Sequence, residues 1–178
     1  MIVGIDASNI RGGGGVTHLV ELLRAADPVR HGFSQVIVWG GRATLESIED
    51  RPWVKKVHQP ALDRNLWFRA TWQIGRLSRR ATEAGCEVLF IPGGSYVGRF
   101  HPMATFHQNL MPFQWRELRR FGVSWMTVKM LLLRMVQTET FRRAEGLICL
   151  TEHARGLLMG VIKRTSGDRK STRLNSSH

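Results

Sequence analysis

The sequence predicts an α/β fold, a Rossmann-like and mostly parallel sheet flanked by helices, and three observations support this prediction. Short apolar runs typical of buried strands alternate along the chain with segments whose apolar residues recur at helical spacing. Residues 1–26 have the pattern of a strand, a glycine-rich loop and a helix, which is the first crossover of such a sheet. Several predicted strands end in glycine pairs or polar residues, so ligand-binding groups are expected at the carboxyl edge of the sheet.

The first crossover is the segment around which the rest of the chain is organised. An apolar run ends at Asp6, and a polar loop leads to a helix that we expect to begin at Val16. Leu19, Leu22 and Leu23 fall on one face of this helix, which predicts that this face packs on the sheet. In a parallel sheet the helix N-terminus then lies at the carboxyl edge, where anionic ligands bind.

The loop of this crossover holds four successive glycines, Gly12, Gly13, Gly14 and Gly15. Glycine lets the main chain adopt positive φ and approach a ligand closely, so the loop predicts binding of phosphate or sugar; a merely flexible turn is the alternative. The loop is not a P-loop, because Val16, Thr17 and His18 follow the glycines where a Lys-Ser or Lys-Thr pair is required. No third glycine completes a dinucleotide fingerprint, which disfavours nicotinamide cofactors.

The remaining elements alternate in the same way. Further strands are predicted at residues 35–39, 54–58, 88–91, 103–106 and 146–150. Further helices are predicted at residues 42–48, 65–84, 114–144 with a break near 122–124, and 151–161. Gly85 is expected to end the second of these helices, and Thr151 is expected to cap the N-terminus of the last one.

The helix predicted at residues 65–84 is the longest of the first half of the chain. Its apolar residues recur at helical spacing and define the face expected to pack on the sheet: Leu66, Ala70, Ile74, Leu77 and Ala81. Arginines are spread around its polar side: Arg64, Arg69, Arg76, Arg79 and Arg80. The pattern therefore predicts an amphipathic helix with a basic outer surface.

Composition limits the class of protein. The 178 residues, of which 43% are hydrophobic, suffice for one domain with a sizeable core, which we place at residues 1–165. Only Cys86 and Cys149 are present, which favours a reducing cytosol over a disulfide framework. The chain opens on a strand and no apolar run is long enough to span a bilayer, so a cytoplasmic protein is expected. The formal charge of +12 predicts attraction to polyanions such as nucleic acid, an anionic membrane surface or phosphorylated substrates.

Residues 166–178 are expected to be a disordered, artefactual tail. From Asp168 onward the residues resemble the translation of a sequencing adapter, and the segment is too polar to pack. If the reading frame was interrupted near Gly167, the chain is the N-terminal piece of a longer protein. Chemistry that needs a second domain would then be outside this chain.

Three strand ends can now be compared together. Gly14 and Gly15 follow the first strand, and His107 with Asn109 follows the fifth. The last strand is followed by a third group, Thr151, Glu152 and Arg155. In this order and spacing they resemble the N-terminal domain of glycosyltransferases of the GT-B fold, specifically the family-4-like group that transfers a sugar from a nucleotide donor. The resemblance covers residues 1–162, and its specificity comes from the combined order of the motifs.

The resemblance implies an acceptor-binding Rossmann-like domain, with the donor nucleotide held mainly by a second domain across a cleft. It assigns a catalytic position to His107, which would point into the cleft. It assigns substrate-binding positions to Gly14, Gly15, Asn109, Thr151, Glu152 and Arg155. The glycine loop adds Gly12 and Gly13 as predicted substrate-binding residues, and His18 in the first turn of the helix is a further candidate. The family often has an acid directly after this histidine, and Gln108 and Asn109 stand there instead. The acceptor would be a glycan or a glycolipid in cell-surface polysaccharide or lipopolysaccharide biosynthesis, and the fragment alone would be inactive.

The chemistry of sugar transfer agrees with these positions. A departing diphosphate can be stabilised by backbone N–H groups, a helix N-terminus and nearby arginine or lysine, without a metal. The sequence has no metal-type cluster of carboxylates or histidines, so no metal and no cofactor beyond the nucleotide-sugar cosubstrate is expected. His107 could move a proton near neutral pH, because the reference pKa of histidine is about 6.5. A purely structural role is the alternative for His107 and the favoured interpretation for His18.

Residues 115–143 interleave tryptophan, phenylalanine, methionine and leucine with arginine and lysine. This composition suits peripheral contact with an anionic membrane, which would place the protein on the inner face of the membrane. The alternative is a helix buried in the domain whose arginines extend outward to solvent.

Two other functions compete with sugar transfer. The charge and the six tryptophans also suit a non-enzymatic basic module that binds nucleic acid or an anionic membrane. Nucleic-acid binders gather basic and aromatic side chains on one face, whereas here Gly, His and Thr gather at strand ends, so no nucleic acid is expected. A sugar-nucleotide dehydrogenase or epimerase is disfavoured by the missing dinucleotide fingerprint.

Overall fold

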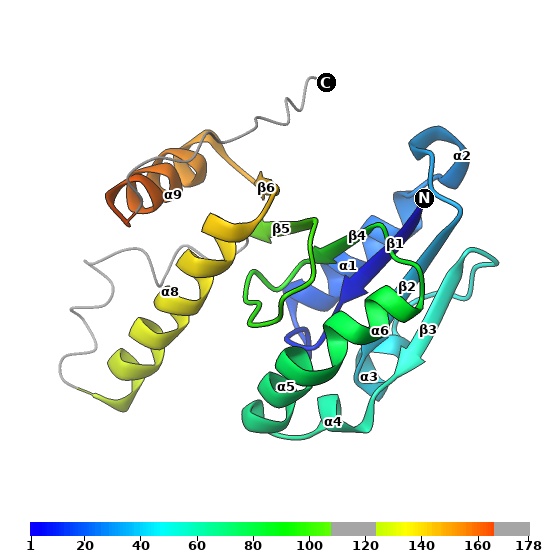
Figure 1. The fold of residues 1–178 in the computed structure, drawn as a ribbon, viewed down its shortest axis with the longest axis horizontal. Helices are drawn as coiled ribbons and strands as arrows, with labels where there is room; N and C mark the ends of the chain where they lie inside the picture. The colour runs from blue at the N-terminus through cyan, green and yellow to red at the C-terminus, as the bar shows by residue number, and fades with distance from the viewer. Residues whose placement is uncertain (108–123, 166–178) are drawn as a thin grey trace.

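The computed structural model describes residues 1–107 and 124–165. These residues form a six-stranded sheet with the strand order β3-β2-β1-β4-β5-β6, in which all neighbouring strands are parallel (Figure 1). The strands are β1 (Ile2–Asp6), β2 (Gln35–Gly40), β3 (Val54–His58), β4 (Val88–Ile91), β5 (Met103–His107) and β6 (Gly146–Cys149). The predicted Rossmann-like α/β fold is confirmed.

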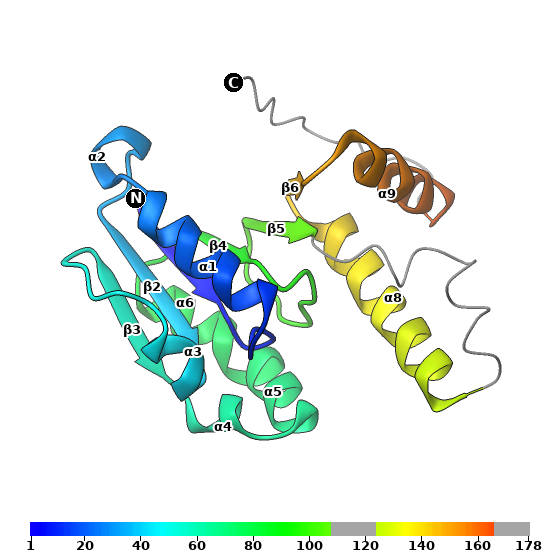
Figure 2. The same ribbon diagram turned by 180° about the vertical axis from the view of Figure 1, so that it is seen from behind.

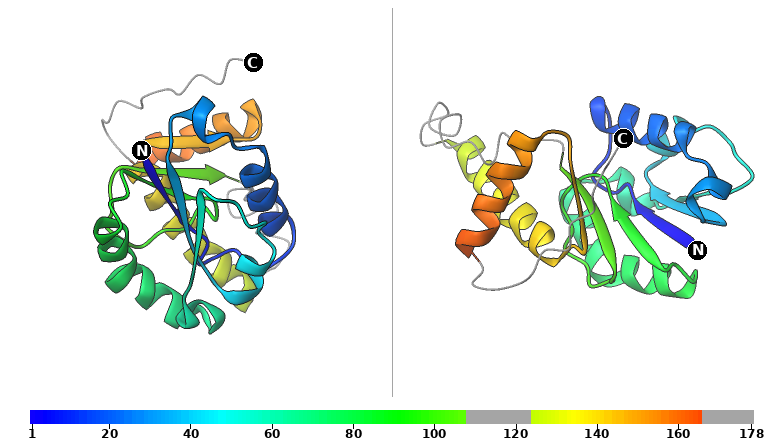
Figure 3. Two further views of the ribbon diagram at one scale, coloured as in Figure 1. Left: turned by 90° about the vertical axis from the view of Figure 1, so that its right-hand side faces the viewer. Right: turned by 90° about the horizontal axis from the view of Figure 1, so that it is seen from above.

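Helices cover both faces of the sheet. They are α1 (Gly14–Ala25), α2 (Pro28–His31), α3 (Arg42–Glu46), α4 (Pro60–Asp63), α5 (Leu66–Trp72), the π-helix η1 (Gln73–Leu77), α6 (Ser78–Glu83), α8 (Trp125–Arg143) and α9 (Glu152–Thr165). Helices α5 and α6 lie in front of the sheet in Figure 1, and α1 lies in front of it when the molecule is seen from behind in Figure 2. Helices α8 and α9 lie beyond β5 and β6 (Figure 3).

Most of the core consists of two apolar layers, one on each face of the sheet, and a smaller cluster joins Phe141 of α8 to Leu158 of α9. Val36 and Val38 of β2 pack in the layer beneath α1 and α3, whereas Ile37 and Trp39 pack in the layer beneath α5, η1 and α6. Because successive strand residues point to opposite faces, a strand buried on both faces needs a continuous apolar run. This is why the run at residues 35–39 predicted β2 so well.

Helix α1 begins two residues earlier than predicted, at Gly14 instead of Val16. Its N-cap is Gly13, with φ 61° and ψ −152°, a combination that side-chain-bearing residues avoid. Gly14 and Gly15 therefore belong to the first turn of the helix. Of the four successive glycines, Gly13 is the one whose backbone requires glycine.

The helix predicted at residues 65–84 is present as α5, η1 and α6 in succession, with Asn65 as N-cap and a left-handed Gly85 after its end. Its predicted buried face is wrong in the first half, because Leu66 and Ile74 are 58% and 59% exposed. The π-helix has hydrogen bonds from residue i to i+5, so it accommodates one residue more than an α-helical turn. The helix residues that precede the π-helical turn are therefore shifted by one position relative to a regular α-helix. As a result Gln73 is buried in place of Ile74.

The second half of the chain agrees with the prediction where it is described. Helix α8 begins just after the predicted break, with Ser124 as N-cap, and Thr151 caps α9 by accepting a hydrogen bond from the Ala154 N–H at 3.1 Å. Helix α9 ends at Thr165, beyond the predicted residue 161. Asn109, the tail at 166–178 and the first part of the 115–143 segment lie outside the described residues.

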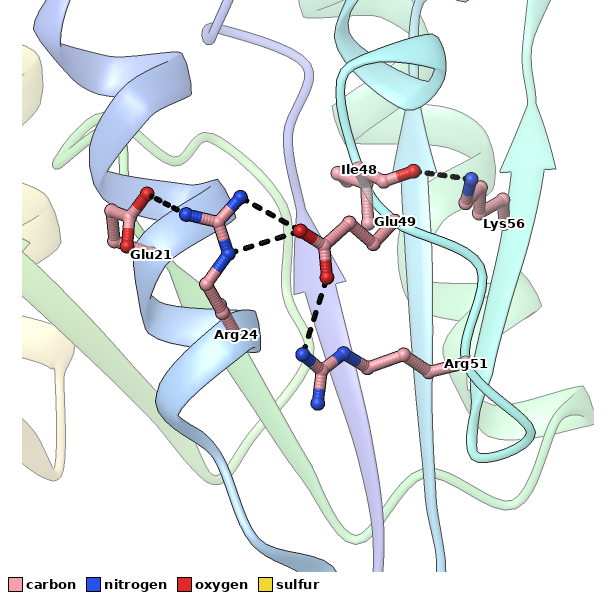
Figure 4. Close-up of polar contacts among 6 residues, drawn as sticks. All are labelled: Glu21, Arg24, Ile48, Glu49, Arg51 and Lys56. Atoms are coloured by element: carbon pink, nitrogen blue, oxygen red, sulfur yellow. Dashed lines mark hydrogen bonds and ion pairs between the residues drawn. The ribbon is translucent and has the colours of Figure 1, made fainter.

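A surface network ties α1 to the chain between α3 and β3 (Figure 4). Arg24 contacts Glu21 and Glu49 at 2.7 Å each, and Arg51 contacts Glu49 at 3.2 Å. Hydrogen bonds and charge from Arg24 and Arg51 lower the pKa of Glu49. Because these pairs are half-exposed, solvent screens them and each contributes little to stability. Part of the basic charge of the chain is thus neutralised far from the carboxyl edge of the sheet.

Candidate functional site

A pocket of about 440 Å³ lies at the carboxyl edge of the sheet. It is bounded by the loop after β1, by α5 with η1, by the loop after β4, and by α8. Ligand pockets of this size commonly form at that edge of a parallel sheet. The predicted residues Gly12 and Gly15 both line it.

Gln73 of the π-helix connects the pocket to the end of β1. It is 3% exposed, and its Nε2 donates hydrogen bonds to the Asp6 carboxylate and, at 2.8 Å, to Ser8 Oγ. These bonds use both amide hydrogens and fix the orientation of the amide group. Nε2 also lies 3.4 Å from the Ser95 carbonyl oxygen, and the Gln73 side chain lines the pocket.

Asp6 lies beneath this amide at the end of β1. It is 2% exposed, and it accepts a hydrogen bond from the Ser8 N–H at 3.0 Å as well as the bond from Gln73. Burial raises the pKa of Asp6 above its usual value of 3.8, because the charged form loses its hydration; the bonds from Ser8 and Gln73 act in the opposite direction. The carboxyl group therefore anchors the β1 loop to η1 under the pocket.

Arg69 supplies positive charge to the same wall of the pocket. Its Nη1 lies 3.4 Å from the Ser8 carbonyl oxygen and 3.5 Å from Asn9 Oδ1, which are long hydrogen bonds, and its Nε is buried without a partner. Burial, with the nearby charge of Arg11, lowers the pKa of Arg69, but a guanidinium stays protonated in proteins. A cation whose donors are poorly used thus lines the pocket.

The opposite wall comes from α8, which contributes Lys129, Leu133, Val136 and Gln137. Gln137 is 6% exposed, and its Oε1 is buried without a hydrogen-bond partner. The lining residues that the structure describes include the two cations Arg69 and Lys129 and no carboxylate. The pocket is therefore electrostatically suited to an anionic ligand.

Helix α8 is held in this position by a buried contact with the β4 loop. The Tyr96 N–H donates to Thr140 Oγ1 at 2.9 Å, and the Thr140 hydroxyl lies 3.1 Å from the Tyr96 carbonyl oxygen. Both side chains are almost completely buried. This contact places Lys129 and Gln137, on the preceding turns of α8, opposite Arg69 and Gln73.

The other predicted site residues that the structure describes lie at the same edge of the sheet but do not line this pocket. Gly13 and Gly14 form the start of α1, and the half-buried His18 ring stacks on the Phe106 ring with centroids 4.4 Å apart. His107 is the last residue of β5, and its backbone pairs in register with Cys149 of β6. Its position at the carboxyl edge matches the prediction.

The predicted residues after β6 have partners of their own. Thr151 caps α9, and the Glu152 carboxylate accepts a hydrogen bond from Arg155 Nη1 at 3.0 Å. The Glu152 side chain is 85% exposed and that of Arg155 is 44% exposed, so solvent screens this ion pair. Their contribution to ligand binding stays a prediction.

The predicted membrane-contacting segment is described from Ser124 onward. Helix α8 exposes an apolar set on the side away from the pocket: Val128, Leu131, Leu132 and Met135. Its other side lines the pocket and packs on the β4 loop. The helix is thus partly buried in the domain and partly apolar toward solvent, and membrane contact stays a prediction.

The pocket residues to which the site chemistry is assigned were not among the predicted site residues: Arg69, Gln73, Lys129 and Gln137. A signal for two of them existed. Counting back from the buried Ala81 and Leu77 in steps of four leads to Gln73 and Arg69, polar residues on a stripe that becomes buried. The positions on α8 had no such signal, because the contact between α8 and the β4 loop is not local in sequence.

Among residues 1–107 and 124–165, no group of three or more His, Cys, Asp or Glu side chains is arranged to hold a metal ion. None of the described helices is both long enough and apolar enough to cross a membrane.

The fold and the site together define a Rossmann-like α/β protein with a polar, cationic pocket at the carboxyl edge of its sheet. Comparison of the chain with models of protein families, with curated proteins and with solved structures gave no significant match.

Replacing Asp6 by asparagine should change how stability depends on pH. In the folded wild-type chain Asp6 keeps its proton at pH values where the unfolded chain has released it, because burial raises its pKa above 3.8. The stability that Asp6 contributes by holding its proton is fully present below pH 3.8, the usual pKa that applies in the unfolded chain. It is lost as pH rises through the pKa that Asp6 has in the folded chain. Asparagine does not titrate, so the variant should gain stability relative to wild type as pH rises from 3.8, by at most about 1.4 kcal/mol per pH unit.

Urea unfolding of both proteins between pH 4 and pH 8 measures this difference. The loss of one hydrogen-bond acceptor adds a constant offset, which does not affect the slope. A difference in unfolding free energy that stays constant over the whole range would show that the pKa of Asp6 is not raised by burial.

Proposed function

We propose that this chain is the acceptor-side domain of a glycosyltransferase that transfers a sugar from a nucleotide-sugar donor to a glycan or glycolipid acceptor. The observation that carries the proposal is the pocket at the carboxyl edge, where Gly12 and Gly15 of the β1 loop and α1 meet the cations Arg69 and Lys129. The order of motifs at the strand ends, which resembles the GT-B fold, supports the same conclusion. The donor nucleotide would be held mainly by a second domain.

The N-terminus of α1 supplies chemistry that sugar transfer needs. The first N–H groups of a helix have no acceptor within the helix, and the helix dipole favours an anion there. Helix α1 has no acidic residue in its first turn and no capping side chain bonded to it, so no side chain of the helix itself neutralises this end. The departing diphosphate of a nucleotide sugar would be stabilised there without a metal.

His107 would supply proton transfer. The residue ends β5 at the same edge as the first turn of α1, and the preceding residue, Phe106, packs against His18 of that helix. A histidine so placed can accept a proton from the attacking hydroxyl near neutral pH or donate a hydrogen bond to it. In this proposal the protein is cytoplasmic and contacts the inner face of the membrane through residues 115–143.

A non-enzymatic basic module is the second candidate. The observation in its favour is that Arg79 and Arg80 are exposed on α6, which gives the domain a basic outer surface. Both arginines, however, lie within 4.0 Å of the Glu83 carboxylate, which reduces the charge available to a polyanion. Lys129 and Arg69 lie in a pocket instead, which favours a small ligand over an extended one.

The test uses the protein expressed from its complete open reading frame, incubated with a panel of nucleotide sugars and of sugar and glycolipid acceptors. We expect nucleotide release that depends on the acceptor and needs no added metal. An absence of turnover with every donor, together with nucleic-acid binding that weakens steeply with salt, would replace this function by the second candidate.

A further inference from the structure

We propose that the pocket binds a phosphorylated polyol, with the phosphate on Arg69 and Lys129 and the hydroxyl groups on the amide oxygens of Gln73 and Gln137. This ligand would be the acceptor of the transfer reaction. Its role as acceptor rests on the proposed function, whereas its binding to the pocket does not. Arg69 and Lys129 also support the proposed function, whereas Gln73 and Gln137 play no part in it, and none of the four belongs to the strand-end motifs that resemble the GT-B fold.

The cationic part of the pocket favours an oxyanion. The Arg69 Nε–H is buried without an acceptor, and the bonds of Nη1 are long, at 3.4 and 3.5 Å. A buried donor without an acceptor is unfavourable, and an anionic oxygen is the strongest acceptor that a ligand can offer to a guanidinium. Lys129 on the facing helix supplies a second positive charge, and no described lining residue is a carboxylate that would repel the anion.

The amide part of the pocket favours hydroxyl groups. The Gln137 side chain is only 6% exposed, and its Oε1 is buried without a hydrogen-bond donor. Gln73 commits its amide hydrogens to Asp6 and Ser8, so it offers an oxygen as well. The dianion of a phosphate monoester has no hydrogen to donate to either oxygen and inorganic hydrogen phosphate has one, whereas a polyol has several. A ligand that satisfies both parts of the pocket therefore needs an anionic group and neighbouring hydroxyls.

The remaining lining suits the carbon skeleton of such a ligand. Ala70 of α5 and Leu133 and Val136 of α8 give the pocket apolar walls between its polar groups. A pocket of about 440 Å³ is within the usual range for small ligands. The phosphate could belong to a free sugar phosphate or to a phospholipid whose headgroup is a polyol, because the two share this chemistry.

Calorimetric titration of the 178-residue chain with glucose 6-phosphate, glucose and inorganic phosphate tests the proposal. We expect glucose 6-phosphate to bind at least tenfold more tightly than either glucose or phosphate. Cosedimentation with phosphatidylglycerol vesicles examines the lipid source. Vesicle binding that depends on Arg69 and Gln137, without binding of glucose 6-phosphate, would assign the same chemistry to a lipid headgroup.

The variants Arg69→Met and Gln137→Leu should each weaken the binding of glucose 6-phosphate about tenfold or more. The first removes a cation that would hold the phosphate, and the second removes an amide oxygen that would accept from a hydroxyl group. The matched control is Arg76→Met, which removes an exposed arginine of η1 that does not line the pocket and should leave the affinity unchanged. If Arg69→Met does not fold, as judged by circular dichroism, Lys129→Met on α8 tests the same part.

If phosphate binds as tightly as glucose 6-phosphate, the amide oxygens do not bind hydroxyl groups. If glucose binds as tightly as glucose 6-phosphate, Arg69 and Lys129 do not bind the phosphate. Unchanged affinity in both folded variants would place the ligand elsewhere. These titrations contain no nucleotide and need no turnover. Binding without transfer by the complete protein would refute the proposed function alone, and transfer to neutral acceptors without this binding would refute the ligand class alone.

Discussion

In the glycosyltransferase that we propose, replacing His107 by alanine is expected to lower kcat by roughly 10²-fold, with little change in melting temperature. His107 ends β5 at the carboxyl edge of the sheet, where its backbone pairs in register with Cys149, the last residue of β6. At such an edge an imidazole can exchange a proton with an attacking hydroxyl, which alanine cannot do. Initial rates at saturating donor and acceptor, together with thermal unfolding of the same samples, measure both quantities.

His31→Ala is the matched control, because His31 is exposed on α2, near the amino ends of the strands. This variant should retain full kcat. His107→Gln separates the two roles of the imidazole, since glutamine can donate a hydrogen bond but cannot take up a proton at neutral pH. If His107→Ala instead lowers the melting temperature and leaves the activity per folded molecule unchanged, His107 has a structural role only.

Replacing Gln73 by leucine should lower the free energy of unfolding at pH 7 by roughly 2–4 kcal/mol. The substitution removes the donor to the buried Asp6 carboxylate and to Ser8 Oγ. A buried acceptor without a donor loses its hydration without compensation. The bond from Gln73 also lowers the pKa of Asp6, so its loss raises that pKa further and the destabilisation should be larger at pH 7 than at pH 4.

The control for this variant is Arg76→Leu, an exposed position in the same π-helix, which should change stability by no more than about 0.5 kcal/mol. Denaturant unfolding at the two pH values gives the comparison. An equal loss of stability in both variants would mean that the π-helix itself, and not the amide of Gln73, supports the fold.

The strands were the part of the fold that could be predicted best from the sequence. Strands β3 and β4 have the predicted bounds, because an apolar run between turn residues leaves few alternatives in a sheet covered on both faces. The start of α1 was placed two residues late, at Val16. Gly14 and Gly15 can be helical or not, and only the packing of the helix on the sheet decides between these conformations.

The candidate site was predictable only in part. Gly12 and Gly15 were expected in it because a glycine loop at a strand end is a local signal. Gln73 and Arg69 were missed because the predicted face ran from Leu77 to the apolar Ile74, whereas the π-helical turn buries the polar Gln73 instead. Lys129 and Gln137 reach the pocket because Thr140 of the same helix bonds to Tyr96, a contact between residues far apart in sequence.

The π-helix has a consequence for how this pocket could change in evolution. One turn of it holds one residue more than an α-helical turn, so a chain one codon shorter could keep both ends of the helix in place with a regular helix between them. Such a deletion would remove the extra position that brings Gln73 under the β1 loop. Gain or loss of a single codon is therefore a route by which the ligand preference of this pocket can change while the sheet, its order and its helices stay the same.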